Sequence, residues 1–109
     1  MAITIIDQNT FEETIGCGKI VIVDFFATWC GPCKALAPIL EEVSEEVNAE
    51  EVVFAKLDID QNVPLARKYG VMSVPTMVAF KDGKAIVKMI GLHPKEDVLN
   101  LIEEAKKRA

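Results

Sequence analysis

The chain has 109 residues, a length that fits one domain spanning residues 1–109 and leaves no room for a second. Half of the residues are hydrophobic and 27% are charged, which is ordinary globular composition and argues against intrinsic disorder. The formal net charge of −5 disfavours a nucleic-acid backbone or an anionic membrane as a partner. Three cysteines are too few for a disulfide scaffold, and the odd number leaves at least one unpaired.

No targeting or membrane-spanning segment is expected. The stretch from Met1 to Phe11 has neither a basic start nor an apolar run of signal-peptide length. The longest apolar stretch, Ile20 to Ala27, is interrupted by Asp24 and is much shorter than the roughly 20 residues of a membrane-spanning helix. We therefore expect a protein of the reducing cytoplasm, where a cysteine pair more often binds metal or performs redox chemistry than forms a structural disulfide.

Hydrophobic patterning in the first half of the chain predicts strands and helices in alternation. The predicted strands are Ala2 to Ile6, Ile20 to Ala27 and Val52 to Leu57, and the predicted helices are Asp7 to Ile15, Pro32 to about Val47 and Val63 to Tyr69. The second and third strands are rich in β-branched residues, which is typical of strands buried on both faces. Gly70 is expected to end the third helix.

The second half predicts a hairpin followed by a final helix. Strands at Thr76 to Phe80 and Ala85 to Ile90 are joined through Asp82-Gly83, a strong hairpin signal. A helix is predicted from about Pro94 to Lys107, with Pro94 in its first turn. The order βαβαβαββα predicts an α/β domain, with a mixed sheet covered by helices on both faces.

The expected chemistry lies in the stretch Trp29-Cys30-Gly31-Pro32-Cys33-Lys34, where a predicted strand ends and a helix begins. The spacing lets the two sulfurs meet across one helical turn. Unpaired N–H groups and the positive end of the helix dipole would stabilise a Cys30 thiolate, the species that attacks disulfides. The placement predicts Cys30 as the attacking nucleophile and Cys33 as the less exposed, resolving thiol.

The alternative for these cysteines is a structural zinc site. Zinc usually takes four ligands, and the remaining soft ligands in the chain are Cys17 and the single His93. The position of the pair at a helix start favours redox use instead. Cys17 is otherwise expected to be a passive loop thiol, with redox regulation as the alternative, and His93 a residue at a helix start without catalytic duty.

Four segments together carry a resemblance to a known family: Trp29 to Lys34, Val23-Asp24-Phe25 before it, and Val74-Pro75-Thr76 and Phe80 to Lys84 after it. In these motifs and in element order, essentially the whole chain resembles the thioredoxin family. The resemblance implies the thioredoxin fold, a five-stranded mixed β-sheet flanked by four α-helices, and a general protein-disulfide reductase. The sequence departs from common members at Phe26, where many have a second Trp, and at Ser73, where Gly is frequent.

The same resemblance implies roles for single residues. Asp24 would be the buried acid that deprotonates Cys33, modulated by Lys56, while Gly31 and Pro32 would tune the redox potential. Pro75 would form a cis bond that places Val74 beside Cys30. The residues expected to form the surface that contacts substrates are Trp29, Gly31, Pro32, Val74, Pro75 and Gly91. Three alternatives stay open: Asp24 facing a small cavity, Lys56 as an ordinary strand lysine, and Gly91 as a plain turn residue.

The expected partners are target proteins with exposed disulfides and a separate thioredoxin reductase that restores the dithiol. No cofactor is expected, because the chain has neither a Gly-x-Gly-x-x-Gly motif nor a phosphate-binding loop. We expect a monomer. Alternatives are a disulfide oxidase or isomerase, a glutaredoxin and a non-catalytic docking module. The Gly31-Pro32 dipeptide and the absence of an export signal favour reduction.

Overall fold

The computed structural model describes residues 3–109, so Ala2, the first residue of the predicted first strand, lies outside the described residues. The elements are β1 (Ile3–Ile6), α1 (Phe11–Ile15), β2 (Ile20–Phe26), α2 (Gly31–Glu46), β3 (Val52–Asp58), α3 (Val63–Lys68), β4 (Thr76–Lys81), β5 (Lys84–Ile90) and α4 (Lys95–Arg108). Their order confirms the predicted βαβαβαββα sequence. No helix in the part of the chain described here is both long enough and apolar enough to span a membrane.

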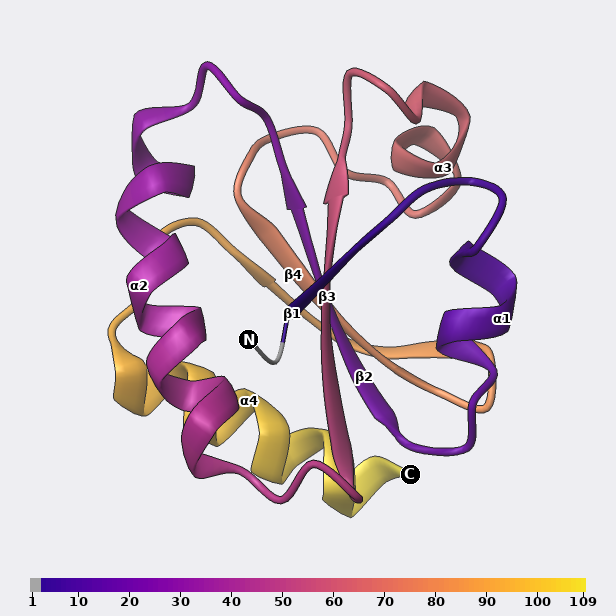
Figure 1. The fold of residues 1–109 in the computed structure, drawn as a ribbon, viewed down its shortest axis with the longest axis vertical. Coiled ribbons are helices and arrows are strands. Elements are labelled where there is room, and N and C mark those ends of the chain that lie inside the picture. The colour runs from indigo at the N-terminus through magenta and orange to yellow at the C-terminus, as the bar shows by residue number, and fades with distance from the viewer. Residues whose placement is uncertain (1–2) are drawn as a thin grey trace.

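The strands form one five-stranded sheet in the order β1-β3-β2-β4-β5 (Figure 1). β3 is parallel to both β1 and β2, and β4 is antiparallel to both β2 and β5, so the sheet is mixed as predicted. β2 lies in the centre of the sheet. The segment that follows its C-terminal end therefore lies near the loop after β3 and the loop before β4.

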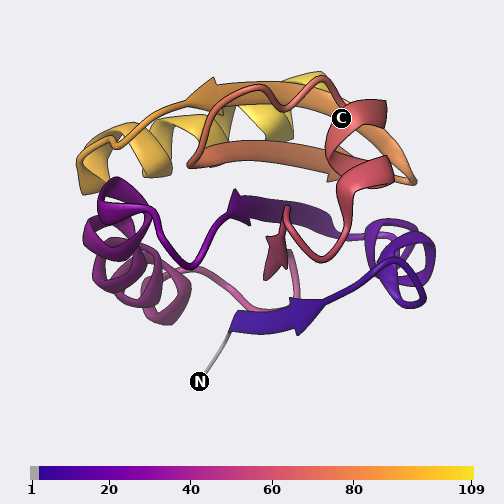
Figure 2. The ribbon, with the colours of Figure 1, turned by 90° about the horizontal axis from the view of Figure 1, so that it is seen from above.

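Helices cover both faces of the sheet, α2 and α4 on one side and α1 and α3 on the other (Figures 1 and 2). Alternate side chains of β2 pack on the two faces of the sheet, because successive side chains of a strand point to opposite faces. Ile20 and Ile22 belong to the cluster under α2 and α4, whereas Val21, Val23 and Phe25 belong to the cluster under α1.

One predicted helix start is wrong by more than the one- or two-residue uncertainty of helix ends. The first helix begins at Phe11 and not at Asp7, because the Asp7 carboxylate accepts the N–H groups of Asn9 and Thr10 and forms a turn. The last helix begins at Lys95, one residue after its predicted start, and Pro94 is its N-cap residue in an extended conformation with φ −70° and ψ 165°. The other boundaries agree with the prediction or differ from it by one residue.

Candidate redox site

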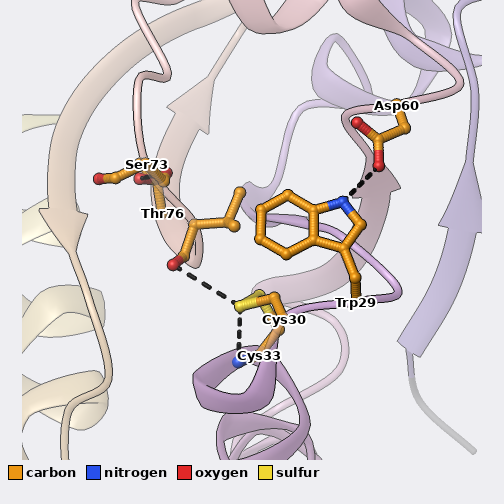
Figure 3. Close-up of a disulfide and its surroundings, with 7 residues drawn as sticks. Trp29, Cys30, Cys33, Asp60, Ser73 and Thr76 are labelled. Atoms are coloured by element: carbon orange, nitrogen blue, oxygen red, sulfur yellow. Dashed lines mark hydrogen bonds between the residues drawn. A yellow bond between two sulfur atoms is a disulfide. The ribbon is translucent and has the colours of Figure 1, made fainter.

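Cys30 and Cys33 lie at the N-terminus of α2, shortly after the end of β2. Cys30 is the N-cap residue of the helix, and the exposed Gly31 and Pro32 are its first two residues. Cys30 and Cys33 are joined as a disulfide, with their Cα atoms 5.2 Å apart. Cys33 donates its backbone N–H to Cys30 Sγ at 3.1 Å (Figure 3). The helix start therefore directs a hydrogen-bond donor and its positive dipole end at the Cys30 sulfur.

The two cysteines are equally buried, at 4% exposure each, so the expectation that Cys33 is less exposed than Cys30 is wrong. The reason is that side chains from other segments, Phe26, Ile59 and Val74, pack against the pair. Exposure therefore does not distinguish the attacking sulfur from the resolving one, and the distinction has to come from the hydrogen bond to Cys30 Sγ.

A loop before β4 covers the disulfide. The Val74–Pro75 peptide bond in this loop is cis, and the Val74 carbonyl oxygen lies 3.7 Å from Cys30 Sγ (Figure 3). The buried Thr76 hydroxyl donates to the Ser73 carbonyl at 2.8 Å, and Gly91 donates its N–H to the Pro75 carbonyl at 2.8 Å. Gly91 has a φ of +93°, so it serves the turn after β5 while also contacting this loop.

Trp29 lies beside the disulfide, and 68% of its surface is exposed. Its indole N–H donates to the Asp60 carboxylate at 2.8 Å, which ties the segment before α2 to the segment after β3 (Figure 3). Other exposed apolar side chains, Met72, Ile90 and Leu92, flank Pro75 or Gly91 in the sequence, and Met72 is 96% exposed. Sequence reasoning missed these residues and Asp60, because neither the exposure of single apolar side chains nor a hydrogen bond between distant segments has a pattern in the sequence.

Asp24 is an acid inside the central strand, and only 1% of it is exposed. Strand alternation places it on the same face as Ile20 and Ile22, which is the face that α2 covers. Neither of its carboxylate oxygens has a hydrogen-bond partner among the described residues. Burial raises the pKa of Asp24 to about 6, and the positive charge of Lys56 opposes this rise.

Lys56 is the register partner of Asp24 on the adjacent strand β3. Its ammonium lies 4.5 Å from the centre of the Phe26 ring, a cation–π contact. Together with Phe26, Cys33 and Lys34, Lys56 lines a hollow of about 210 Å³ beside α2. A space of this size with polar groups on its wall can hold water beside Cys33.

The remaining soft ligands do not converge on the pair. Cys17 is an exposed free thiol that precedes β2, whereas Cys30 follows β2, so the two lie at opposite ends of a strand about 20 Å long. Both ring nitrogens of His93 are engaged, with Asp97 and with the Ile90 carbonyl. A zinc site built from all three cysteines and His93 is therefore ruled out by geometry.

Comparisons with known proteins agree with this architecture. The family model described as Thioredoxin matches residues 2–104. The thioredoxin of Staphylococcus saprophyticus is 43% identical over 104 residues, covering 95% of this chain and 98% of that protein. Staphylococcus aureus thioredoxin is 41% identical with the same coverage.

Solved structures give the same result. A point-mutant thioredoxin from Halobacterium salinarum NRC-1 superposes with a TM-score of 0.86 at 35% identity, covering 94% of this chain and 89% of its own. Malassezia sympodialis thioredoxin superposes with a TM-score of 0.85 at 33% identity, covering 94% and 90%. The chain belongs to the thioredoxin family of protein-disulfide oxidoreductases.

Proposed function

We propose that this thioredoxin-family protein reduces target disulfides with Cys30 as the attacking thiol and Cys33 as the resolving thiol. The observation that carries the assignment is the hydrogen bond of 3.1 Å from the Cys33 N–H to Cys30 Sγ at the start of α2. In the reduced protein the same donor and the helix dipole would stabilise a thiolate on Cys30. Cys33 is the third residue of the helix, so its side chain does not occupy the N-cap position toward which the free N–H groups of the helix start point.

The reaction proceeds by two thiolate attacks. The Cys30 thiolate attacks one sulfur of the target disulfide, and a mixed disulfide forms while the other target sulfur leaves as a thiolate. The Cys33 thiolate then attacks Cys30 Sγ, the mixed disulfide breaks, and the second target sulfur leaves. The target gains the electron pair that the Cys30–Cys33 pair loses.

Asp24 is the proposed base for the second attack. A carboxyl group with a pKa of about 6 is mostly ionised at neutral pH and still basic enough to accept a thiol proton. Asp24 and its register partner Lys56 lie on the sheet face under α2, and Lys56 and Cys33 both line the hollow beside this helix. Lys56 adjusts the basicity of Asp24 because its positive charge stabilises the carboxylate.

Targets are proposed to dock on a surface formed by Trp29, Gly31, Pro32, the Val74–Pro75 segment and Gly91. The Val74 backbone lies beside Cys30, in a position to pair with an extended segment of the target as an added strand does. The exposed Met72, Ile90 and Leu92 extend the surface and give apolar contact area. Gly31 and Pro32 at the helix start are proposed to tune the redox potential of the pair.

We further propose that a separate thioredoxin reductase restores the dithiol, that the reaction takes place in the cytoplasm, and that the protein works as a monomer. The exposed free thiol of Cys17 supports a reducing compartment, since such thiols oxidise easily elsewhere. Sedimentation of the reduced protein tests the monomer, and turnover with either an NADPH-linked or a ferredoxin-linked reductase identifies the donor.

The assignment of the two sulfurs is tested by trapping. Cys33→Ser should form a stable mixed disulfide with insulin, visible on a non-reducing gel, because the resolving thiol is missing. Cys30→Ser should trap nothing and should not reduce insulin. Cys17→Ser is the matched control and should turn over insulin like the unmodified protein. Equal turnover by Cys30→Ser, or trapping through Cys33 in that variant, would contradict the proposal.

A further inference from the structure

His93 lies in the turn between β5 and α4, and both of its ring nitrogens face oxygen atoms. Nδ1 is 2.8 Å from the Asp97 carboxylate on α4, and Nε2 is 2.8 Å from the Ile90 carbonyl at the end of β5. The ring therefore bridges the last residue of the strand and the first turn of the helix, across the whole turn.

Both of these partners can only accept a hydrogen bond, since one is a carbonyl and the other an ionised carboxylate. A neutral imidazole has one N–H and can donate to only one of them, whereas the imidazolium donates to both. The hydrogen bond to Asp97 and then that to the Ile90 carbonyl raise the pKa of His93 above its ordinary value, partly offset by burial. The full bridge is therefore a property of protonated His93.

The turn that His93 bridges belongs to the edge of the disulfide site. Ile90 and Leu92 are exposed apolar side chains, and Gly91 between them donates its N–H to the Pro75 carbonyl at 2.8 Å. Anything that fixes the Ile90 carbonyl fixes the neighbouring Gly91 N–H as well. His93 is thus linked to the cis-proline loop through the single peptide unit between Ile90 and Gly91.

We propose that protonated His93 is a positioning residue for protein targets, which holds the Ile90–Leu92 turn against Pro75 so that docking weakens when His93 loses its proton. The inference rests on the proposed docking surface and extends it by one residue behind that surface. It concerns the binding of extended protein segments and not the exchange chemistry of the sulfurs.

Other charged groups near the ring do not replace Asp97 as its partner. Lys88 of β5 and Glu104 of α4 line the same hollow as His93 and Asp97. Glu104 is paired with Arg108 at 2.8 Å, and the Lys88 ammonium faces the Gly70 carbonyl at 3.5 Å. Since the folded-state pKa of His93 is raised, the bridge is complete at low pH and is lost as pH rises through that pKa.

The titration itself can be measured directly, because the chain contains one histidine. NMR of the imidazole protons should give a pKa above the ordinary value of about 6.5. Asp97→Asn should lower it, because the amide replaces the carboxylate that stabilises the imidazolium. An unmodified protein with an ordinary His93 pKa, or an Asp97→Asn variant with an unchanged one, would overturn the bridge.

The functional test compares a protein target with a small one. Pre-reduced protein is mixed with insulin, and single-turnover rates at each pH give a half-saturating insulin concentration and a maximal rate. The half-saturating concentration should rise about two- to fivefold through the His93 pKa, in line with the modest strength of a partly exposed ion pair. In Asp97→Asn the midpoint of this rise should move down together with the NMR pKa, and in His93→Gln the rise should be absent.

Reduction of hydroxyethyl disulfide, which is too small to span the turn, reports the pH dependence of the sulfur chemistry in each variant. A rise in half-saturation that is equal for both substrates, or one that persists in His93→Gln, would refute the positioning role. If the underlying assignment fails instead, Cys33→Ser traps no insulin and the pre-reduced protein does not reduce it at any pH.

Discussion

At the residue scale, the site combines two groups whose ionisation the fold controls in opposite ways. The helix start favours negative charge on Cys30, because an N–H and the dipole point at its sulfur. The apolar face under α2 disfavours negative charge on Asp24, because its oxygens have no hydrogen-bond partner among the described residues. A stabilised thiolate suits attack, and a carboxylate held at a raised pKa suits proton transfer.

The raised pKa of Asp24 makes a prediction about stability. Its rise from 3.8 to about 6 means that the folded protein binds this proton more tightly than the unfolded chain does. Between these pH values the folded state holds more protons, so the free energy of unfolding falls as pH rises. Ionised Asp24 should therefore cost on the order of 3 kcal/mol at pH values well above its folded pKa.

Asp24→Asn removes this cost. Its stability relative to the unmodified protein should increase by on the order of 3 kcal/mol between about pH 4 and pH 8, as measured by urea unfolding of the oxidised proteins. Asp82→Asn, at an exposed turn, is the control and should show no such increase. A difference for Asp24→Asn that does not change with pH would mean that the carboxyl group is not penalised by burial.

At the element scale, the β4–β5 hairpin depends on backbone conformations that most residues avoid. Asp82 and Gly83 have φ values of 51° and +81°, and the Gly83 N–H donates to the Ile15 carbonyl at 3.0 Å. Gly83→Ala should therefore lower the free energy of unfolding by about 1 kcal/mol, through left-handed backbone strain alone. An alanine Cβ at this position would meet no atom within 4 Å.

Gly31→Ala is the matched control for this change. It introduces the same methyl group in equally open space, but its backbone is not left-handed, so urea unfolding should show no loss of stability. Equal destabilisation by the two substitutions would show that the added methyl group, and not the turn conformation, is responsible.

The elements that could be predicted from the sequence are those whose signal is local. Asp82-Gly83 and the β-branched run before Phe25 were sufficient for the hairpin and the central strand. The start of α1 was not predictable from periodicity, since Phe11 and Ile15 fit a longer helix equally well. There the Asp7 side chain competes for the backbone N–H groups, and that competition is visible only in the structure.

For the site, the spacing of the cysteines and the resemblance predict that Cys30, Cys33, Asp24 and Pro75 belong to one site. The resemblance also predicts Val74 beside Cys30, but the packing of Ile59 against the pair could not be predicted, because Ile59 is distant from both cysteines in sequence and belongs to none of the motifs. The His93 bridge was missed for the same reason. A histidine at a helix start has no pattern that shows where both of its nitrogens will point.

An ionic contact also joins two elements that cover the same face. Lys95 at the start of α4 binds Glu42 at 3.1 Å and also contacts Glu46, both on α2, so the acidic face of α2 is partly paired and not simply solvated. Lys95→Met should lower the urea midpoint slightly at low ionic strength and not at all in concentrated salt, because exposed pairs are screened. Lys107→Met, on the same helix, should have no effect in either condition.

At the scale of the whole molecule, one sheet separates two cores, and the disulfide lies at the end of the strand that they share. Residues 20 and 22 of β2 serve one core and residues 21, 23 and 25 serve the other. A substitution that loosens the packing of either core should therefore perturb β2, and with it the start of α2, which follows β2 in the chain. A molecule built in this way should unfold as one cooperative unit, as most single domains of its size do.

Two truncations test this expectation from opposite sides of the sheet. Leu40 in α2 and Ile15 in α1 are both buried, in different cores. Leu40→Ala and Ile15→Ala should each lower the free energy of unfolding by about 2–5 kcal/mol, the usual cost of such a cavity. In both variants the far-ultraviolet circular dichroism and the fluorescence of Trp29, the chain's single tryptophan, should change at the same urea concentration. If Ile15→Ala loses secondary structure before Trp29 fluorescence changes, the two cores unfold separately, and the shared strand does not couple the far face of the sheet to the disulfide.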